Sequence, residues 1–260
     1  MNWALQRQLF YIGILLAFFL ILAILIIYPR FNRAPSCVDG RQNGTETGID
    51  CGGSCTNACI SQVEDVSVLW ARSFRVVPGR YNAVAYITNH NKNAVVDKIS
   101  YRFRFADKDN LYIGKREGTA YIPRAGNFAI FEPAVDLGSS VPVYTTFEFT
   151  SKPQWIQAGE EKLDQIKILV SNIQLENESG SPHLSATVKN TSLLTIPEVN
   201  VVALLYDASH NAITASSTFI DELAGEETHQ VDFTWPEPFT APVIAKEIIP
   251  IYNISKVKWK

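Results

Sequence analysis

The sequence lacks the residue patterns by which most enzymes are recognised. Its histidines are scattered, with no pair spaced to bind a metal, at His90, His183, His210 and His229. It has no glycine-rich phosphate loop and no Gly-x-Ser-x-Gly turn. Ser255 and Lys258 fit the Ser-x-x-Lys pattern of acylating enzymes, but they are expected at the end of a strand rather than at the start of a helix. We therefore predict no catalytic residues and no enzymatic activity.

Dense clusters of basic residues are absent as well. Residues 1–30 carry two arginines and no acidic residue, and the rest of the chain has 21 basic and 26 acidic residues, a net charge of −5. Proteins that bind nucleic acid need a basic patch to neutralise phosphates. Nucleic acid is therefore not expected as a partner.

Long apolar runs are missing except near the N-terminus, where 20 residues from Leu9 to Tyr28 carry no charge. A helix of that length rises about 30 Å, the thickness of the hydrocarbon core of a bilayer. A cleaved signal peptide has a shorter apolar region, of about 7 to 15 residues, that ends in a small-x-small cleavage site. Here Pro29, which should end the helix, and Arg30 follow instead. We predict an uncleaved transmembrane helix at about residues 9–28, with membrane lipid as its partner.

The charges that flank this segment and the cysteines that follow it point to opposite orientations. Arg7 precedes the segment, and Arg30, Arg33 and Arg41 follow it, which favours a cytoplasmic body under the positive-inside rule. Long folded regions are translocated largely regardless of that rule. Because the cysteines indicate an oxidising compartment, we expect a cytoplasmic N-terminus and C-terminal domains outside the cytoplasm.

All four cysteines lie within residues 37–59, with the spacing C-x13-C-x3-C-x3-C, at Cys37, Cys51, Cys55 and Cys59. Zinc sites usually bring cysteines in two close pairs, whereas here one cysteine stands apart from a group of three. An even number of cysteines beside a membrane anchor favours two disulfides. Four cysteines permit three pairings, and the spacing does not choose among them.

The same stretch has glycine at every fourth position from Gly40 to Gly52. Oxygen-bearing side chains lie between these glycines, at Asp39, Asn43, Glu46 and Asp50. Calcium prefers such ligands, although the spacing is not that of an EF-hand. The alternative is that these side chains cap turns and face water. No cofactor is certain, and calcium is the candidate.

The rest of the chain contains a tandem repeat. Similar segments recur in the same order at offsets of 99 to 105 residues, among them Ala125-Gly126 with Ala224-Gly225, Glu132-Pro133 with Glu237-Pro238, and Ser151–Trp155 with Ser255–Trp259. Within each copy apolar and polar residues alternate, as in Ile99–Asp107, which predicts half-buried strands. We predict an all-β chain with two immunoglobulin-like sandwiches at residues 61–157 and 158–260, preceded by a tail and helix (1–30) and a cysteine-rich module (31–60).

Two segments resemble known families. Lys189–Ser192, Leu205-Tyr206-Asp207 and Leu223–Glu226 resemble the FxLYD-type immunoglobulin-like domain of prokaryotic envelope proteins, although Ala203 stands where the family has phenylalanine. Residues 37–59 are similar to a CxDGxxNGxETGxDCGGxCxxC module of microbial surface proteins, although three residues separate the last two cysteines here. These resemblances imply a β-sandwich fold and an exported setting, and they carry over no catalytic residue.

Together these features predict a non-enzymatic, single-pass membrane protein that presents two sandwiches for a structural, adhesion or assembly role. An alternative is an accessory subunit of an envelope complex, with the transmembrane helix as the interface, since Gly13 and Ala17 form a small-xxx-small pair. A weaker alternative is an envelope protein that binds carbohydrate or acts as an enzyme.

Overall fold

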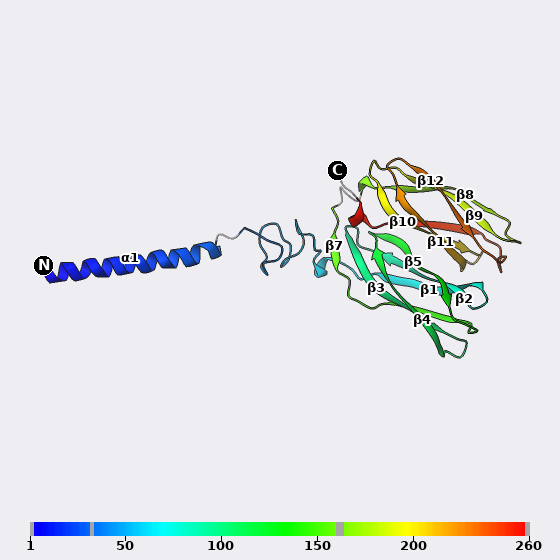
Figure 1. Ribbon diagram of the computed structural model, residues 1–260, viewed down its shortest axis with the longest axis horizontal. Helices are drawn as coiled ribbons and strands as arrows, with labels where there is room; N and C mark the ends of the chain where they lie inside the picture. Colours follow the sequence, from blue (N-terminus) through cyan, green and yellow to red (C-terminus); the bar gives the residue numbers. More distant parts are fainter. Residues whose placement is uncertain (1–2, 32–33, 160–163, 258–260) are drawn as a thin grey trace. The chain divides into compact units, whose positions relative to one another are not determined.

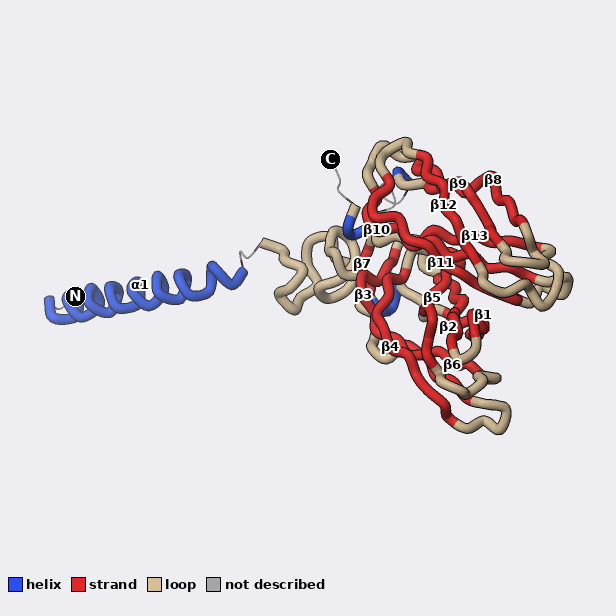
Figure 2. The backbone as a smooth tube through the Cα atoms, turned by 45° about the vertical axis from the view of Figure 1, so that its right-hand side comes forward, coloured by secondary structure: helices blue, strands red, loops and turns tan. Residues whose placement is uncertain are grey.

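The computed structural model describes residues 3–31, 34–159 and 164–257. The chain divides into two compact units, Met1–Ser54 and Cys55–Lys260, whose elements are labelled in Figures 1 and 2. Two residues of the predicted repeat, Lys258 and Trp259, lie outside the described residues. The helix of the first unit is α1 (Trp3–Phe31). The strands of the second unit are β1 (Ser67–Val77), β2 (Arg80–Asn89), β3 (Ala94–Ala106), β4 (Tyr112–Ile122), β5 (Gly126–Asp136), β6 (Tyr144–Phe149), β7 (Trp155–Gln157), β8 (Ile168–Glu176), β9 (His183–Asn190), β10 (Ile196–Tyr206), β11 (Ala212–Leu223), β12 (Thr228–Thr234) and β13 (Ala245–Ile251), with short 3₁₀ turns at Ile60–Gln62 and Ile254–Lys256.

The helix α1 is longer at both ends than the predicted segment. Its portion Trp3–Tyr28 is long and apolar enough to cross a membrane, and its side chains are exposed. The prediction that Pro29 ends the helix was wrong by two residues, because the fixed φ of proline fits a helix and only one backbone hydrogen bond is lost. Length and composition of α1 fit a membrane anchor and also fit a signal sequence.

All four cysteines are disulfide-bonded, as predicted. Among the described residues of the first unit, the chain after α1 consists of turns, and the one strand-like pairing joins Gly48 and Cys51. The residues just after Cys55 belong to the second unit and form backbone hydrogen bonds with its strand β7. The backbone N–H of Ala58 donates to the carbonyl of Trp155, and that of Gln157 donates to the carbonyl of Thr56.

The second unit consists of two β-sandwiches with the same strand order (Figure 1). In sandwich 1, the sheet β1-β2-β5 packs on the sheet β4-β3-β6, with β7 paired to the start of β3. In sandwich 2, the sheet β8-β9-β12 packs on the sheet β11-β10-β13. The fold class is confirmed: apart from α1, the helical residues Asp164 and Gln165 and two short 3₁₀ turns, the regular structure in the described residues is β-strand (Figure 2). The identical strand order explains the repeat in the sequence.

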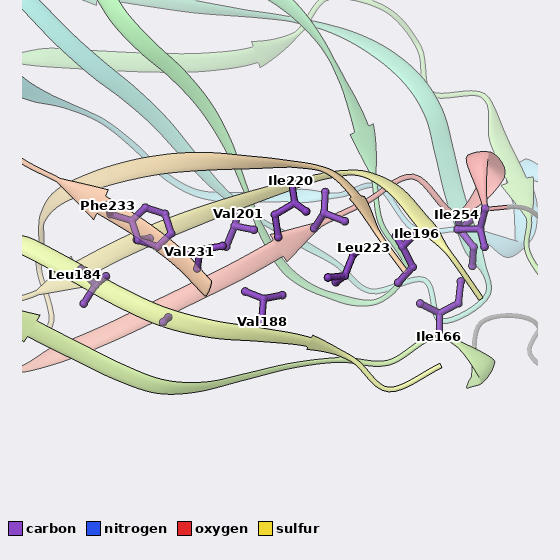
Figure 3. Close-up of a cluster of buried hydrophobic side chains, with 14 of the residues drawn as sticks. Ile166, Leu184, Val188, Ile196, Val201, Ile220, Leu223, Val231, Phe233 and Ile254 are labelled. Atoms are coloured by element: carbon purple, nitrogen blue, oxygen red, sulfur yellow. The ribbon is translucent and has the colours of Figure 1, made fainter. Parts of the chain in front are cut away.

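Each sandwich has its own apolar core, built from the inward-facing side of every strand. Sandwich 1 buries Tyr101 and Phe105 of β3, and sandwich 2 buries Val201 and Leu205 at the matching places of β10. Figure 3 shows the second core, where side chains from β9, β10, β11 and β12 meet between the sheets.

Asparagines at the ends of β2 and β9 fasten equivalent loops in the two copies. The buried Asn190 side chain donates to the carbonyls of Leu194, Leu223 and Ala224, at 2.7 to 3.1 Å. The buried Asn89 side chain donates to the carbonyls of Ala94 and Pro123 in the same manner. This explains in physical terms why an asparagine stands at the same place in both copies.

Candidate functional site

The oxygen atoms of the cysteine-rich module cap its turns. The Asp50 carboxylate accepts hydrogen bonds from the backbone N–H groups of Asp39 and Gly40 at 2.9 to 3.0 Å. The Asp39 carboxylate accepts from the N–H of Arg41 and from the Asn43 side chain. These bonds close the glycine-rich turns around two carboxylates.

Glu46 has the same capping role on the other side of the loop. Its Oε2 atom accepts from the N–H groups of Asn43 and Asp50, at 3.2 and 3.3 Å. Gly53, with φ of 59°, approaches the carbonyl of Thr45 so closely that a Cβ atom would lie 1.8 Å from that oxygen. Glycine is therefore required there by both space and backbone conformation.

Three of the four predicted calcium ligands, the carboxylates, thus accept hydrogen bonds from backbone amides. Asn43 donates its side-chain amide to Asp39, and its buried Oδ1 atom has no hydrogen-bond partner among the described residues. Among the described residues, only one group of three His, Cys, Asp or Glu ligand atoms lies within 4.8 Å, and two of its members are disulfide-bonded cysteines. The carboxylates of Asp39, Glu46 and Asp50 do not converge in that way. The capping interpretation accounts for these side chains as they stand, and calcium binding stays a prediction.

A second site, missed by the sequence analysis, is the junction where the two sandwiches meet. The outer face of the sheet β1-β2-β5 packs on the outer face of the sheet β11-β10-β13 through a separate buried cluster. Its buried members are Phe74, Val84, Tyr86, Ala129, Val202, Leu204, Ala212, Ala215 and Ile249. Because an apolar core of its own joins the two sandwiches, they form one compact unit.

Polar groups at the rim of the junction are paired across it. The Glu247 carboxylate accepts hydrogen bonds from the hydroxyl of Tyr86 at 2.8 Å and from that of Tyr206 at 2.7 Å. Burial and the neighbouring Glu247 charge raise the pKa of Tyr86 to about 12, and the same causes raise the pKa of Tyr206. Asn82 and Arg72 of sandwich 1 donate to backbone carbonyls of β11.

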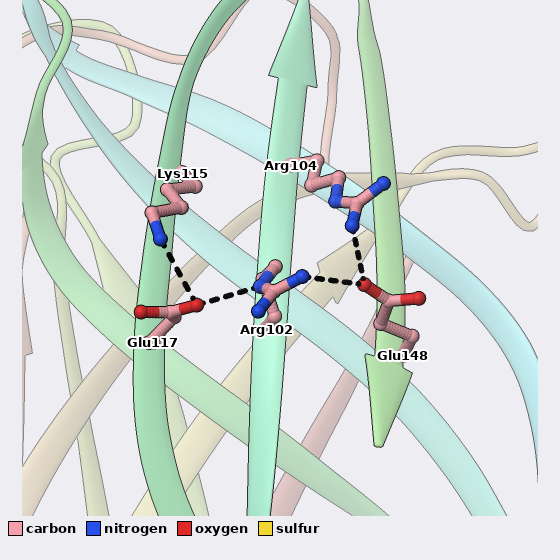
Figure 4. Close-up of polar contacts among 5 residues, drawn as sticks. All are labelled: Arg102, Arg104, Lys115, Glu117 and Glu148. Carbon is pink, nitrogen blue, oxygen red and sulfur yellow. Dashed lines mark hydrogen bonds and ion pairs between the residues drawn. The ribbon is translucent and has the colours of Figure 1, made fainter. Parts of the chain in front are cut away.

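The matching faces of the two copies have opposite polarity. The strand registers place Arg102 and Arg104 of β3 where β10 has Val202 and Leu204, and Glu148 where β13 has Ile249. In sandwich 1 these positions form an exposed ladder of ion pairs (Figure 4), in which Arg102 contacts Glu117 at 2.6 Å and Arg104 contacts Glu148 at 3.0 Å. A face that carries these charges cannot bury itself against another sheet without a large desolvation cost.

The other pair of faces shows the same reversal. Val84 and Tyr86 lie in the junction, whereas the register puts Ser185 and Thr187 at the same places of β9. Ala129 of β5 is likewise replaced by Gln230 of β12. Among the described residues, the two outer faces that meet carry the buried apolar cluster, whereas the matching faces of the copies carry charged and polar side chains.

A cleft of about 520 Å³ opens beside the junction, lined by residues of both sandwiches, Tyr121 and Tyr252 among them. Burial raises the pKa of both tyrosines. At the rim, the Asn253 side chain donates to Asp97 at 2.5 Å, and Lys256 pairs with Glu198.

Comparison with known proteins gives little beyond these observations. No protein-family model matches the chain, and no curated protein matches it. Among solved structures, the chain is similar to red sea bream transglutaminase, with 9% sequence identity and a TM-score of 0.24. That match covers 73% of this chain but only 31% of the transglutaminase, and a similarity this low supports no statement about activity.

Proposed function

We propose that this chain is a single-pass membrane protein whose two sandwiches form one rigid arm outside the cytoplasm. The observation that carries the proposal is the combination of an exposed apolar helix with four cysteines that are all disulfide-bonded. An apolar surface of that size is stable only in lipid or in a protein partner. Disulfides persist in oxidising compartments, and this favours a cytoplasmic N-terminus with the rest of the chain on the other side of the membrane.

The junction supports the rigidity of the arm. Tandem domains with polar contacts move freely relative to one another, whereas a large apolar interface holds their orientation. Here the interface has a buried apolar cluster and a carboxylate shared by tyrosines of both sandwiches. Such an arm is suited to present a surface at a fixed distance and angle, in a structural, adhesion or assembly role and without catalysis.

The resemblance to FxLYD-type domains and to the cysteine module of microbial surface proteins supports a location of this arm in a cell envelope. An envelope protein is then the expected partner. A second form of the proposal makes the chain an accessory subunit held to a membrane complex by α1, whose Gly13 would allow close packing of a neighbouring helix. A stoichiometric partner that co-purifies in detergent would favour this second form.

Single added cysteines test the orientation. Leu193 lies on sandwich 2 with 78% of its side chain exposed, and Gln6 lies exposed near the start of α1. In intact cells a membrane-impermeant maleimide should label Leu193→Cys and leave Gln6→Cys unlabelled until the membrane is permeabilised. The wild-type protein, whose cysteines are all bonded, is the control. The opposite labelling pattern would refute the proposed orientation.

A further inference from the structure

The cleft beside the junction has the composition of a ligand site rather than of a packing defect. Its volume of about 520 Å³ lies in the range of small-molecule sites, which are found preferentially where domains meet. Both sandwiches contribute to it, so it exists only when the two are held together. The junction described above fixes that arrangement.

The walls of the cleft combine aromatic rings with polar side chains. Tyr121 of β4 and Tyr252, which follows β13, both line it and are only partly buried, with Ile251 next to them. A tyrosine ring offers a flat apolar face together with a polar hydroxyl group. Such faces suit a ligand that has C–H groups on one side and polar groups around its edge.

Two polar groups of the rim lie at irregular places of the backbone, one in each copy. The register of β3 shifts between Val96 and Ile99, and Asp97, within this bulge, lines the cleft. Glu198 of β10 lines it as well. Glu198 has a φ of 52°, in the left-handed region that residues other than glycine rarely adopt. Bulges often re-aim side chains beside functional sites.

The charges of the rim cancel. Asp97 and Glu198 are balanced by Lys98 and Lys256, and Lys256 is itself paired with Glu198. Asn253 adds an amide that is held by its bond to Asp97. A charged ligand gains nothing from a balanced rim, whereas fixed carboxylate, amide and ammonium groups can accept from and donate to hydroxyl groups.

We propose that this cleft binds a neutral saccharide, with a sugar ring against Tyr252 and its hydroxyl groups bonded by Asp97, Asn253 and Lys98. Sugars combine a face of C–H groups with a rim of hydroxyl groups, which matches the aromatic wall and the polar rim. This inference goes beyond the proposed function, because it gives the arm a ligand. Its failure would leave the membrane anchor and the junction unaffected.

The test is saturation-transfer NMR on the full chain in a detergent that contains no sugar, with neutral tetrasaccharides of glucose, N-acetylglucosamine and mannose as probes. At least one probe should show transfer from the protein. Tyr252→Ala should weaken that binding about tenfold, since it removes the aromatic wall. Leu193→Ala, at an exposed site of sandwich 2 outside the cleft, is the matched control and should bind as wild type.

A second variant covers the case in which Tyr252→Ala fails to fold. Thr119 is exposed and lines the cleft, so Thr119→Trp should fill the cleft without removing any packing, and should abolish transfer while the melting temperature is kept. Absence of transfer from all three probes at millimolar concentration would overturn the proposal. So would transfer that neither variant reduces, or binding of peptides alone.

Discussion

Tyr86 and Tyr206, on different sandwiches, donate hydrogen bonds to the two oxygens of one carboxylate, that of Glu247. Tyr206 and Glu247 lie diagonally on the neighbouring strands β10 and β13 of sandwich 2, so the bond from Tyr86 is the one that crosses the junction. A partly buried carboxylate without partners would carry a large desolvation cost. The cross-junction bond therefore selects one orientation of the two sandwiches, in addition to stabilising their contact.

The first prediction concerns that bond. Tyr86→Phe keeps the ring in the buried cluster, and with it the stacking on Trp70 at 5.3 Å, but removes the donor to Glu247. We expect it to lower the free energy of unfolding by about 1 to 2 kcal/mol, in the range of hydrogen bonds to charged groups. Urea unfolding of the full chain in detergent measures the change. Tyr112→Phe, at a position 63% exposed, is the control and should have no effect; equal stability of the two variants would contradict the role of the bond.

The second prediction concerns high pH. Because the pKa of Tyr86 is about 12 in the folded protein and near 10 in an unfolded chain, the folded state keeps its proton where the unfolded state has lost it. The stability that this group provides is complete below pH 10 and is lost as the pH rises from 10 to 12. The urea midpoint of wild type should therefore fall more steeply from pH 10 to 12 than that of Tyr86→Phe. Parallel profiles would show that Tyr86 does not titrate as its surroundings indicate.

The sandwiches themselves could be predicted from sequence, because their signals are local. The alternation of apolar and charged residues in Tyr101–Arg104 predicts that one face of β3 is buried and the other is exposed to solvent. The repeat then extends that conclusion to the second copy, including the stretches where alternation is weaker.

The junction was missed because its signal lies in the difference between the copies. Residues 201–205 of β10 are apolar at every position, which indicates burial on both faces, whereas the matching part of β3 alternates. Comparing the copies position by position would have shown that β10 has a second covered face. The path of the chain between the sandwiches determines which sheet covers this second face of β10. No local sequence pattern predicts that path. The cleft is a consequence of the same arrangement and was hidden for the same reason.

The third prediction concerns Asn190, whose side chain joins the end of β9 to two loops. Asn190→Ala leaves three backbone carbonyls without this donor in a buried place, and we expect a loss of about 2 to 4 kcal/mol. Asn172→Ala is the matched control, because the exposed Asn172 side chain donates a single long hydrogen bond, to the half-buried Thr187 at 3.4 Å. Asn172 has a φ of 52°, at which an alanine is strained. Asn172→Ala should therefore lower the free energy of unfolding, but by less than Asn190→Ala. Thermal unfolding of both variants compares them, and an Asn190→Ala loss no larger than that of the control would rule out the fastening role.

The last prediction exchanges residues between the matching faces of the two copies. Leu204 is fully buried in the junction, and Leu204→Arg places there the residue that sandwich 1 has at the same position. A buried, unpaired guanidinium should cost about 3 to 5 kcal/mol and separate the two sandwiches. Scanning calorimetry should then show two unfolding transitions, where the wild-type arm unfolds in one.

The reverse exchange, Arg104→Leu, removes only an exposed ion pair with Glu148 and should change stability by less than about 1 kcal/mol. It adds an apolar side chain to a polar outer face, so the variant should stay folded. Analytical ultracentrifugation should show at most weak self-association. If Leu204→Arg still unfolds in a single transition at the wild-type temperature, the buried cluster does not couple the sandwiches, and the rigid arm must be abandoned.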